Sequence, residues 1–234
     1  MNKVQRCRFW FSITVVTVLG GVGGEAFAKQ SPFSQLFPAL CETNASFSAT
    51  VRLTVIRPAG GTIIVNDVGI ALSGGKMRME TDLVASNTNA EDVARIKRAG
   101  ADRVITVWRP DLDKGYLMLP SRKSYCEGDL SSASGPPFQR WKMSGIHRTE
   151  LGRETVEGHD CVSYHVIVSF ENGTTNDLVI WEAADLKNLP IKLVRKSGQS
   201  TSTAVLKEIN LQPSPALFAP PTDYKRFNSL ADLE

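Results

Sequence analysis

The side chains of this sequence that could do metal chemistry are few. Four cysteines and three histidines occur in 234 residues, and His159 stands two positions before Cys161. A structural zinc site uses four closely spaced nitrogen or sulfur ligands, and no second ligand pair accompanies this one. The pattern therefore predicts no metal site and no cofactor.

Hydrolytic chemistry would need a nucleophile held beside a base, or two carboxylates facing one substrate. The sequence contains no G-x-S-x-G elbow, no phosphate-binding glycine loop and no H-E-x-x-H motif. Glu150, Glu154 and Glu157 lie close together, but they fall in an expected strand region where such residues usually face water. We therefore expect a protein that is not an enzyme.

The cysteines have a structural use as well. An exported protein can form disulfides, but the three cysteines beyond residue 28 cannot all pair within one chain. Cys126 follows an expected strand and Cys161 begins another, which favours a disulfide between them. A disulfide from Cys41 to either partner remains open.

A second group of side chains suits the binding of an apolar ligand. Methionine is unbranched and adapts to irregular shapes, and aromatic residues supply large apolar areas. The same residue types also fill ordinary protein cores, so both uses stay open for each position. The candidates for lining an apolar cavity are Phe47, Val51, Leu53, Met77, Met79, Trp108, Tyr164 and Trp181.

The elements that must position these side chains are short strands. Phe47–Val55 alternates apolar and polar residues, the period of a half-buried strand. Asn172-Gly173 is a strong hairpin signal. Ala101–Tyr125 reads as two strands around a turn at Asp111–Gly115, with Pro120 interrupting the second strand. Hairpin after hairpin predicts about eleven antiparallel strands.

One helix is expected over Ala90–Ala99, with Thr88 or Asn89 as its cap and Gly100 as its stop. A sheet of eleven strands does not lie flat. We predict a mainly β (α+β) fold, in which a strongly curved antiparallel sheet forms an unclosed half-barrel with one or two helices in or over its concave face. A closed barrel is the alternative. Curved sheets of this kind commonly hold one apolar ligand.

Both ends of the chain carry recognisable signals. Lys3, Arg6 and Arg8 precede an apolar run, Phe9–Val22, and Ala28 ends a small-residue cleavage site. We expect residues 1–28 to be a signal peptide and residues 29–234 to be one exported domain. Because the leader carries those three basic residues and one acidic residue, its removal lowers the formal net charge from +3 to +1. That balance predicts no nucleic-acid partner.

The C-terminal stretch of the domain is rich in proline. Prolines surround Leu217 and Phe218 within the segment Pro213–Tyr224. Proline disfavours both helix interiors and central strands. We expect an extended tail that packs across the sheet by these two apolar side chains.

Several motifs, taken in order, resemble a known family. The run at Ala101–Tyr125 follows the predicted helix, and three later runs are GRETVEGHDCVSY (152–164), IWEAADLKNLPI (180–191) and PALFAPPTDY (215–224). Together they resemble the periplasmic lipoprotein-sorting and outer-membrane lipoprotein carrier (LolA/LolB-like) family. The resemblance implies a bacterial envelope protein with an apolar cavity for lipid or lipoprotein acyl chains. Three cysteines and an insertion at Ser131–Pro137 set this chain apart from the carriers.

We therefore predict a non-enzymatic periplasmic protein that holds an apolar ligand in the concave face of its half-barrel. The expected partners are a lipid or lipoprotein acyl chain and inner- or outer-membrane envelope proteins, and the expected state is a monomer. The alternative is a structural or interaction protein of the envelope whose core is filled and binds no ligand.

Overall fold

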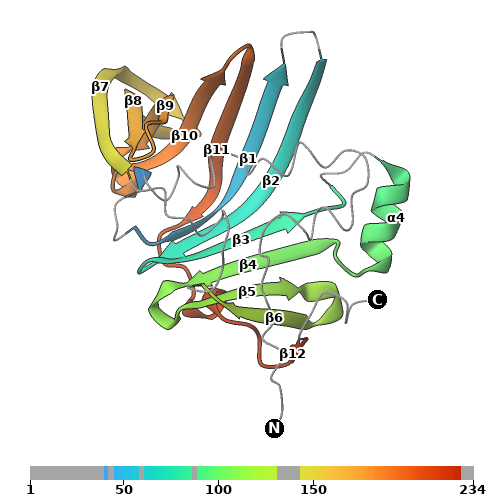
Figure 1. The fold of residues 1–234 in the computed structure, drawn as a ribbon. Coiled ribbons are helices and arrows are strands. Elements are labelled where there is room, and N and C mark those ends of the chain that lie inside the picture. Colours follow the sequence, from blue (N-terminus) through green and yellow to red (C-terminus); the bar gives the residue numbers. More distant parts are fainter. Residues whose placement is uncertain (1–39, 42–44, 58–60, 86–88, 131–142, 228–234) are drawn as a thin grey trace.

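The computed structural model describes residues 40–41, 45–57, 61–85, 89–130 and 143–227. Within these residues twelve strands form one sheet, in the order β12-β6-β5-β4-β3-β2-β1-β11-β10-β9-β8-β7 (Figure 1). The predicted signal peptide, residues 1–28, and the insertion at 131–137 lie outside the described residues.

The bounds of the strands follow the chain closely. They are β1 (Phe47–Arg57), β2 (Gly61–Ser73), β3 (Lys76–Asp82), β4 (Arg103–Arg109), β5 (Lys114–Leu119), β6 (Ser124–Asp129), β7 (Met143–Val156), β8 (His159–Phe170), β9 (Thr175–Ala183), β10 (Leu189–Ser197), β11 (Ser200–Asn210) and β12 (Lys225–Arg226).

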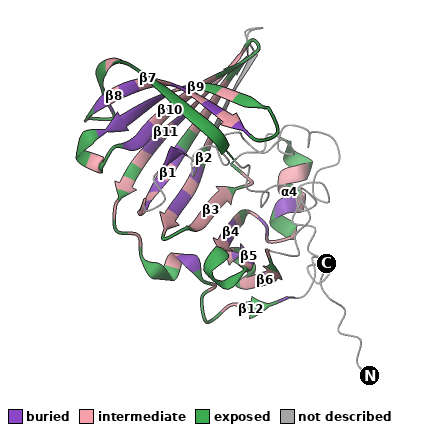
Figure 2. Ribbon diagram, turned by 60° about the vertical axis from the view of Figure 1, so that its left-hand side comes forward, coloured by how far each residue is buried: buried purple, intermediate pink, exposed green. Residues whose placement is uncertain are grey.

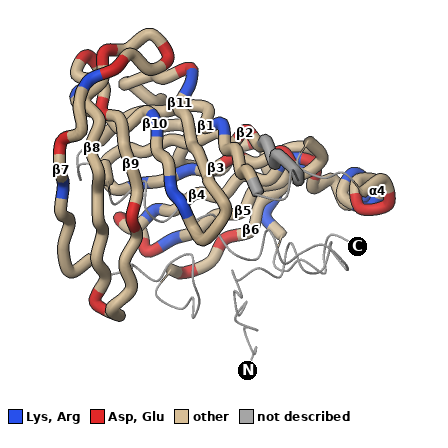
Figure 3. The backbone as a smooth tube through the Cα atoms, turned by 90° about the horizontal axis from the view of Figure 1, so that it is seen from above, with Lys and Arg blue, Asp and Glu red and all other residues tan. Residues whose placement is uncertain are grey.

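Neighbouring strands are antiparallel except β12, which pairs with β6 in parallel. Strand β1 pairs with both β2 and β11, so it joins the two halves of the chain. The sheet is strongly curved and β7 and β12 form its two edges (Figures 1 and 3). The predicted fold class, an unclosed half-barrel with a mostly antiparallel sheet, is confirmed.

The turns explain one difference from the expected strands. Pro110–Leu112 and Pro120–Arg122 are single 3-10 turns, and each is followed by a residue with left-handed backbone, Asp113 at φ 51° and Lys123 at φ 45°. Pro120 therefore reverses the chain instead of interrupting one strand. The segment Ala101–Tyr125 contains parts of three strands, β4, β5 and β6, and not two.

The helix α4 spans Ala90–Arg98, close to the predicted range. Its cap is Asn89, whose Oδ1 accepts hydrogen bonds from the backbone N–H groups of Glu91 and Asp92 at 2.9 and 3.3 Å. Gly100 follows it at φ +62°, the left-handed conformation that ends many helices. No helix in the described residues is long and apolar enough to cross a membrane.

Asn89→Ala is expected to lower the free energy of unfolding by about 1 kcal/mol, because it removes the acceptor for two backbone donors at the start of α4. Chemical denaturation of the two proteins measures the difference. Asn89→Ser keeps a capping oxygen and should recover most of the loss. An equal loss in both variants would contradict the capping role.

The sheet has two faces, which we name by what packs on them. On the helix face, Ile96 of α4 shares a hydrophobic cluster with Leu117 and Leu119 of β5. On the tail face, Met118 of β5 shares another cluster with Phe218. The alternation along β5 separates the two faces, and α4 lies beside the ends of β3 and β4 (Figures 1 and 3).

The C-terminal segment forms the covering of the tail face. Pro215–Phe218 is a short 3-10 helix, and Phe218 is buried while Leu217 is partly buried against the same cluster. The predicted packing of the tail by these two side chains is therefore confirmed, although they lie in a 3-10 helix and not in extended backbone.

The largest hydrophobic cluster lies around β1, β2 and β8 to β11. Val51, Val166, Ile180, Ile191 and Leu206 are all fully buried in it. Figure 2 shows this burial concentrated on the inner strands, while edge strand β7 is exposed over nearly its whole length. The core therefore sits against the middle and one wall of the half-barrel.

Candidate functional site

Strand register brings the candidate lining residues of β1, β3 and β4 into one row. Phe47 lies opposite Leu72, Leu72 opposite Met77, and Met77 opposite Trp108. Residues directly opposite each other in an antiparallel pair point to the same face. Leu117, which opposes Thr106 two positions from Trp108, packs with α4, so this row lies on the helix face.

A second row runs the other way from β1. Leu53 lies opposite Ala204, Ala204 opposite Leu193, Leu193 opposite Ile180, and Ile180 opposite Tyr164. Because Phe47, Val51 and Leu53 occupy alternate positions on β1, both rows share the helix face. The structure thus places seven of the eight candidates on one face: Phe47, Val51, Leu53, Met77, Met79, Trp108 and Tyr164.

These seven residues differ in how far they are open. Phe47 and Val51 are 1% and 0% exposed, so they are part of the packed core. Leu53, Met77, Met79, Trp108 and Tyr164 are all partly exposed. We call these five the lining residues. They are the predicted residues of the helix face that a bound molecule could touch.

The eighth candidate, Trp181, points to the opposite side of the sheet. It is the neighbour of Ile180 on β9 and lies opposite Ser163 and Lys192. The Lys192 Nζ stands 4.0 Å from the ring centroid, and the indole Nε1 donates a hydrogen bond to Glu154. Its contacts are therefore those of a structural residue on the outer side.

Charge separates the two faces along β1 to β4. Among the described side chains of these strands, those on the helix face are all uncharged. The charged ones alternate with them and form ion pairs on the tail face, such as Arg52 with Asp67 at 2.7 Å and Arg78 with Glu80 at 2.7 Å. The helix face here can accept an apolar group without leaving a charge unsolvated.

One ion pair does lie on the helix face, near the β7 edge, and sequence reasoning missed it. Arg148 Nη1 is 2.6 Å from Glu182 Oε1. Arg148 lies opposite Val166 and Glu182 opposite Val162, which put both on the face of Tyr164. Glu182 is only 8% exposed. Glu182 stands at alternate positions with Leu178 and Ile180 along β9, and this spacing is the sequence signal that could have placed it on the helix face.

The three described cysteines are buried thiols, and the predicted Cys126–Cys161 disulfide is wrong in this structure. Cys126 belongs to the cluster under α4, whereas Cys161 belongs to the large core cluster. Eight strands separate β6 from β8 in the sheet. A disulfide needs Cα atoms within about 7 Å, so these two strands hold their cysteines too far apart.

Cys41 lies in the large core cluster, within the electrostatic influence of Glu182. Burial, and secondly the Glu182 carboxylate, raise the pKa of the Cys41 thiol from 9.0 to about 12. Burial also raises the pKa of Cys161. Because the thiolate is the reactive form, neither residue is suited to nucleophilic chemistry at neutral pH.

This raised pKa predicts an alkaline loss of stability. Below about pH 9 the Cys41 thiol is protonated in both states. Above it the unfolded chain releases the proton while the folded chain keeps it, so the free energy of unfolding falls by up to about 1.4 kcal/mol per pH unit. Cys41→Ala should flatten that slope, as urea denaturation between about pH 8 and pH 11 would show. Equal slopes would contradict the buried thiol.

Two of the histidines and one of the clustered glutamates take part in surface ion pairs. His159 Nδ1 lies 2.7 Å from Asp185 and His165 Nε2 lies 2.8 Å from Asp177, with both carboxylates exposed. Glu157 is 3.5 Å from Lys207. In the part of the chain that the structure describes, no three metal-ligating side chains come together.

Comparison with known proteins gives matches in structure only. No protein-family model matches the sequence, and no curated protein matches it. A LolA superfamily protein from Nitrosomonas europaea is 11% identical at a TM-score of 0.36, over 81% of this chain and 96% of that chain. The Mycobacterium tuberculosis lipoprotein LppX is 10% identical at a TM-score of 0.38, over 77% of this chain and 93% of that chain. A chain of the Pseudomonas aeruginosa MucA/MucB complex is 13% identical at a TM-score of 0.41, over 83% of this chain and 62% of that chain.

These structures include a LolA superfamily protein and an outer-membrane lipoprotein-sorting protein domain, the family that the motif order resembles. Similarity at such identities and TM-scores carries no argument about what this chain binds or does. The functional argument rests on the residues of the helix face.

Proposed function

We propose that this chain is a periplasmic binding protein that holds an apolar ligand, a lipid or a lipoprotein acyl chain, against its helix face and acts in envelope lipid or lipoprotein trafficking. The observation that carries the proposal is the uncharged helix face of β1 to β4, with Leu53, Met77, Met79 and Trp108 partly exposed on it.

The chemistry of these side chains suits an acyl chain. Burying one methylene group contributes about 0.8 kcal/mol, so a long chain gains most of its binding energy from contact with apolar surface alone. Methionine adapts to chains of different shape. No catalytic step is part of this function. The proposed protein is a monomer that is exported and whose signal peptide is cleaved after Ala28.

A filled core is the second candidate. Phe47 and Val51 are closed to solvent, so part of the predicted lining already packs against protein. If the lining residues bind no ligand, the chain is a structural or interaction protein of the bacterial envelope.

Native mass spectrometry of the protein purified from the periplasm, followed by lipid extraction, separates the two candidates. A co-purifying acyl-chain lipid in near-stoichiometric amount is the expected result, and it would name the ligand class. A clean apo mass together with no binding of a fluorescent fatty acid would refute the proposal and leave the interaction protein.

A further inference from the structure

A cluster of basic side chains gathers at the end of the sheet that carries α4 and β12. Six exposed residues from three separate segments form it, and we call it the basic corner. Its members are Lys97, Arg98, Arg122, Lys123, Lys225 and Arg226.

Tertiary packing brings the three segments together. Ile96 of α4 and Phe227, directly after β12, belong to one hydrophobic cluster. Gly100 lies so close to Arg122 that a Cβ on it would stand 2.6 Å from the arginine Cγ. The backbone N–H of Lys225 donates to the carbonyl of Lys123 at 2.8 Å. The cations are therefore held near one another by ordered backbone.

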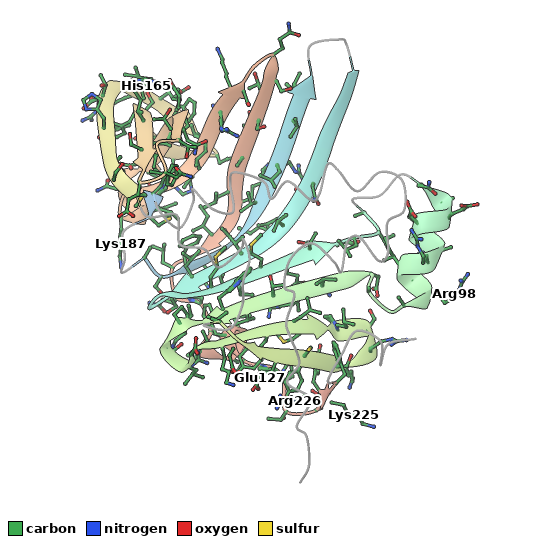
Figure 4. All side chains as sticks on the ribbon, in the orientation of Figure 1. Arg98, Glu127, His165, Lys187, Lys225 and Arg226 are labelled. Atoms are coloured by element: carbon green, nitrogen blue, oxygen red, sulfur yellow. The ribbon has the colours of Figure 1, made fainter. Side chains whose placement is uncertain are left out.

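Figure 4 shows Arg98, Lys225 and Arg226 at the same end of the molecule, far from His165 and Lys187. Two members of the corner have carboxylate neighbours, Lys123 with Asp223 at 2.9 Å and Arg226 with Glu127 at 3.8 Å.

The other four members, Lys97, Arg98, Arg122 and Lys225, form no salt bridge within the described residues. The formal net charge of the chain beyond residue 28 is only +1. A patch with four cations that pair with no described carboxylate therefore stands out from a nearly neutral protein.

The corner lacks the apolar centre that protein interfaces have. The large hydrophobic residues that are exposed in the described chain are Ile56, Leu112, Met143, Ile146 and Leu151, and none belongs to the three segments of the corner. Specific protein interfaces concentrate their energy in buried aromatic and apolar anchors. Clustered lysine and arginine side chains without such anchors suit a diffuse negative surface instead.

We propose that the basic corner docks the protein on an anionic lipid bilayer. Each lysine or arginine near an anionic membrane contributes about 1 kcal/mol, which is about a fivefold increase in membrane partitioning. This interaction goes beyond ligand binding and does not depend on it. Since α4 packs on the helix face, docking would bring the open face of the half-barrel close to the membrane surface.

The test is co-sedimentation of the exported protein with vesicles of pure phosphatidylglycerol and of pure phosphatidylcholine. Binding is expected to phosphatidylglycerol alone, and to weaken as salt shortens the range of the attraction. The double variant R98Q/K225Q should lower partitioning about 25-fold. The matched control K187Q/K196Q removes the same charge from exposed positions elsewhere and should stay within about twofold.

Three results would overturn the proposal. They are equal sedimentation with both lipids, equal losses in both double variants, and no sedimentation with phosphatidylglycerol. In the last case, a photocrosslink to an envelope protein that is lost in R98Q/K225Q would assign the corner to an acidic protein partner. Thermal unfolding of each variant verifies that these exposed substitutions leave the fold intact.

Discussion

Phe218→Ala is expected to lower the free energy of unfolding by about 3–5 kcal/mol, the usual cost of removing a buried phenylalanine. The ring is 2% exposed and packs against Met118 on the tail face. Arg109 donates to the Phe218 carbonyl at 3.2 Å, and Arg78 donates to the Leu217 carbonyl at 3.3 Å. These bonds position the backbone, but only the ring fills the space.

Urea denaturation gives this difference, and Leu112→Ala is the control. Leu112 also lies in a 3-10 turn, but it is 51% exposed, so its loss should change stability by less than about 0.5 kcal/mol. Limited trypsin digestion supplies a second readout, because a released tail frees the backbone at Lys225 and Arg226 from its pairing with β6 and makes it cleavable. A loss in Phe218→Ala no larger than in the control would contradict the docked tail.

The second large effect concerns the proposed ligand. Met79→Asp is expected to weaken binding of a fluorescent fatty acid at least about tenfold, because a carboxylate on the helix face must be desolvated when an acyl chain covers it. Met79 is partly exposed, lies opposite Ile70 and Thr106, and packs against the large core cluster. A probe titration on the purified protein measures the change.

Ile56→Asp is the matched control for this variant. It introduces the same charge on β1, at a position 50% exposed and out of phase with Leu53, so the affinity should not change. Met79→Leu keeps the volume and apolar character and should also bind. If Met79→Asp folds with an unchanged melting temperature and binds as the wild type does, the ligand does not lie on β3.

Features that depend on a few adjacent residues were predictable from the sequence. Alternation along β1 identified Phe47, Val51 and Leu53 as sharing one face, because successive side chains of a strand point to opposite sides. The cap at Asn89 and the stop at Gly100 follow from backbone groups within one helical turn. Asn172-Gly173 likewise produced the hairpin between β8 and β9, with Gly173 at φ +81°.

Features that depend on contacts between distant strands were not predictable from the sequence. Trp181 has the same apolar character as Trp108, yet β9 turns it to the opposite face, because strand phase and not residue type sets the direction of a side chain. The ion pair between Arg148 and Glu182 joins strands that are not adjacent in the sheet. No local pattern around either residue in the sequence predicts its partner.

The sequence by itself determined the mainly β class, the helix at Ala90–Ala99, the packing of the tail and the uncharged positions that alternate along the strands, since each follows from local periodicity and turn chemistry. Only the tertiary structure decided that β1 pairs with β11, which lies about 150 residues away, that Cys126 and Cys161 stay apart, and that six cations form one corner. Those outcomes depend on the order and curvature of the sheet, which are set by packing between segments distant in the chain.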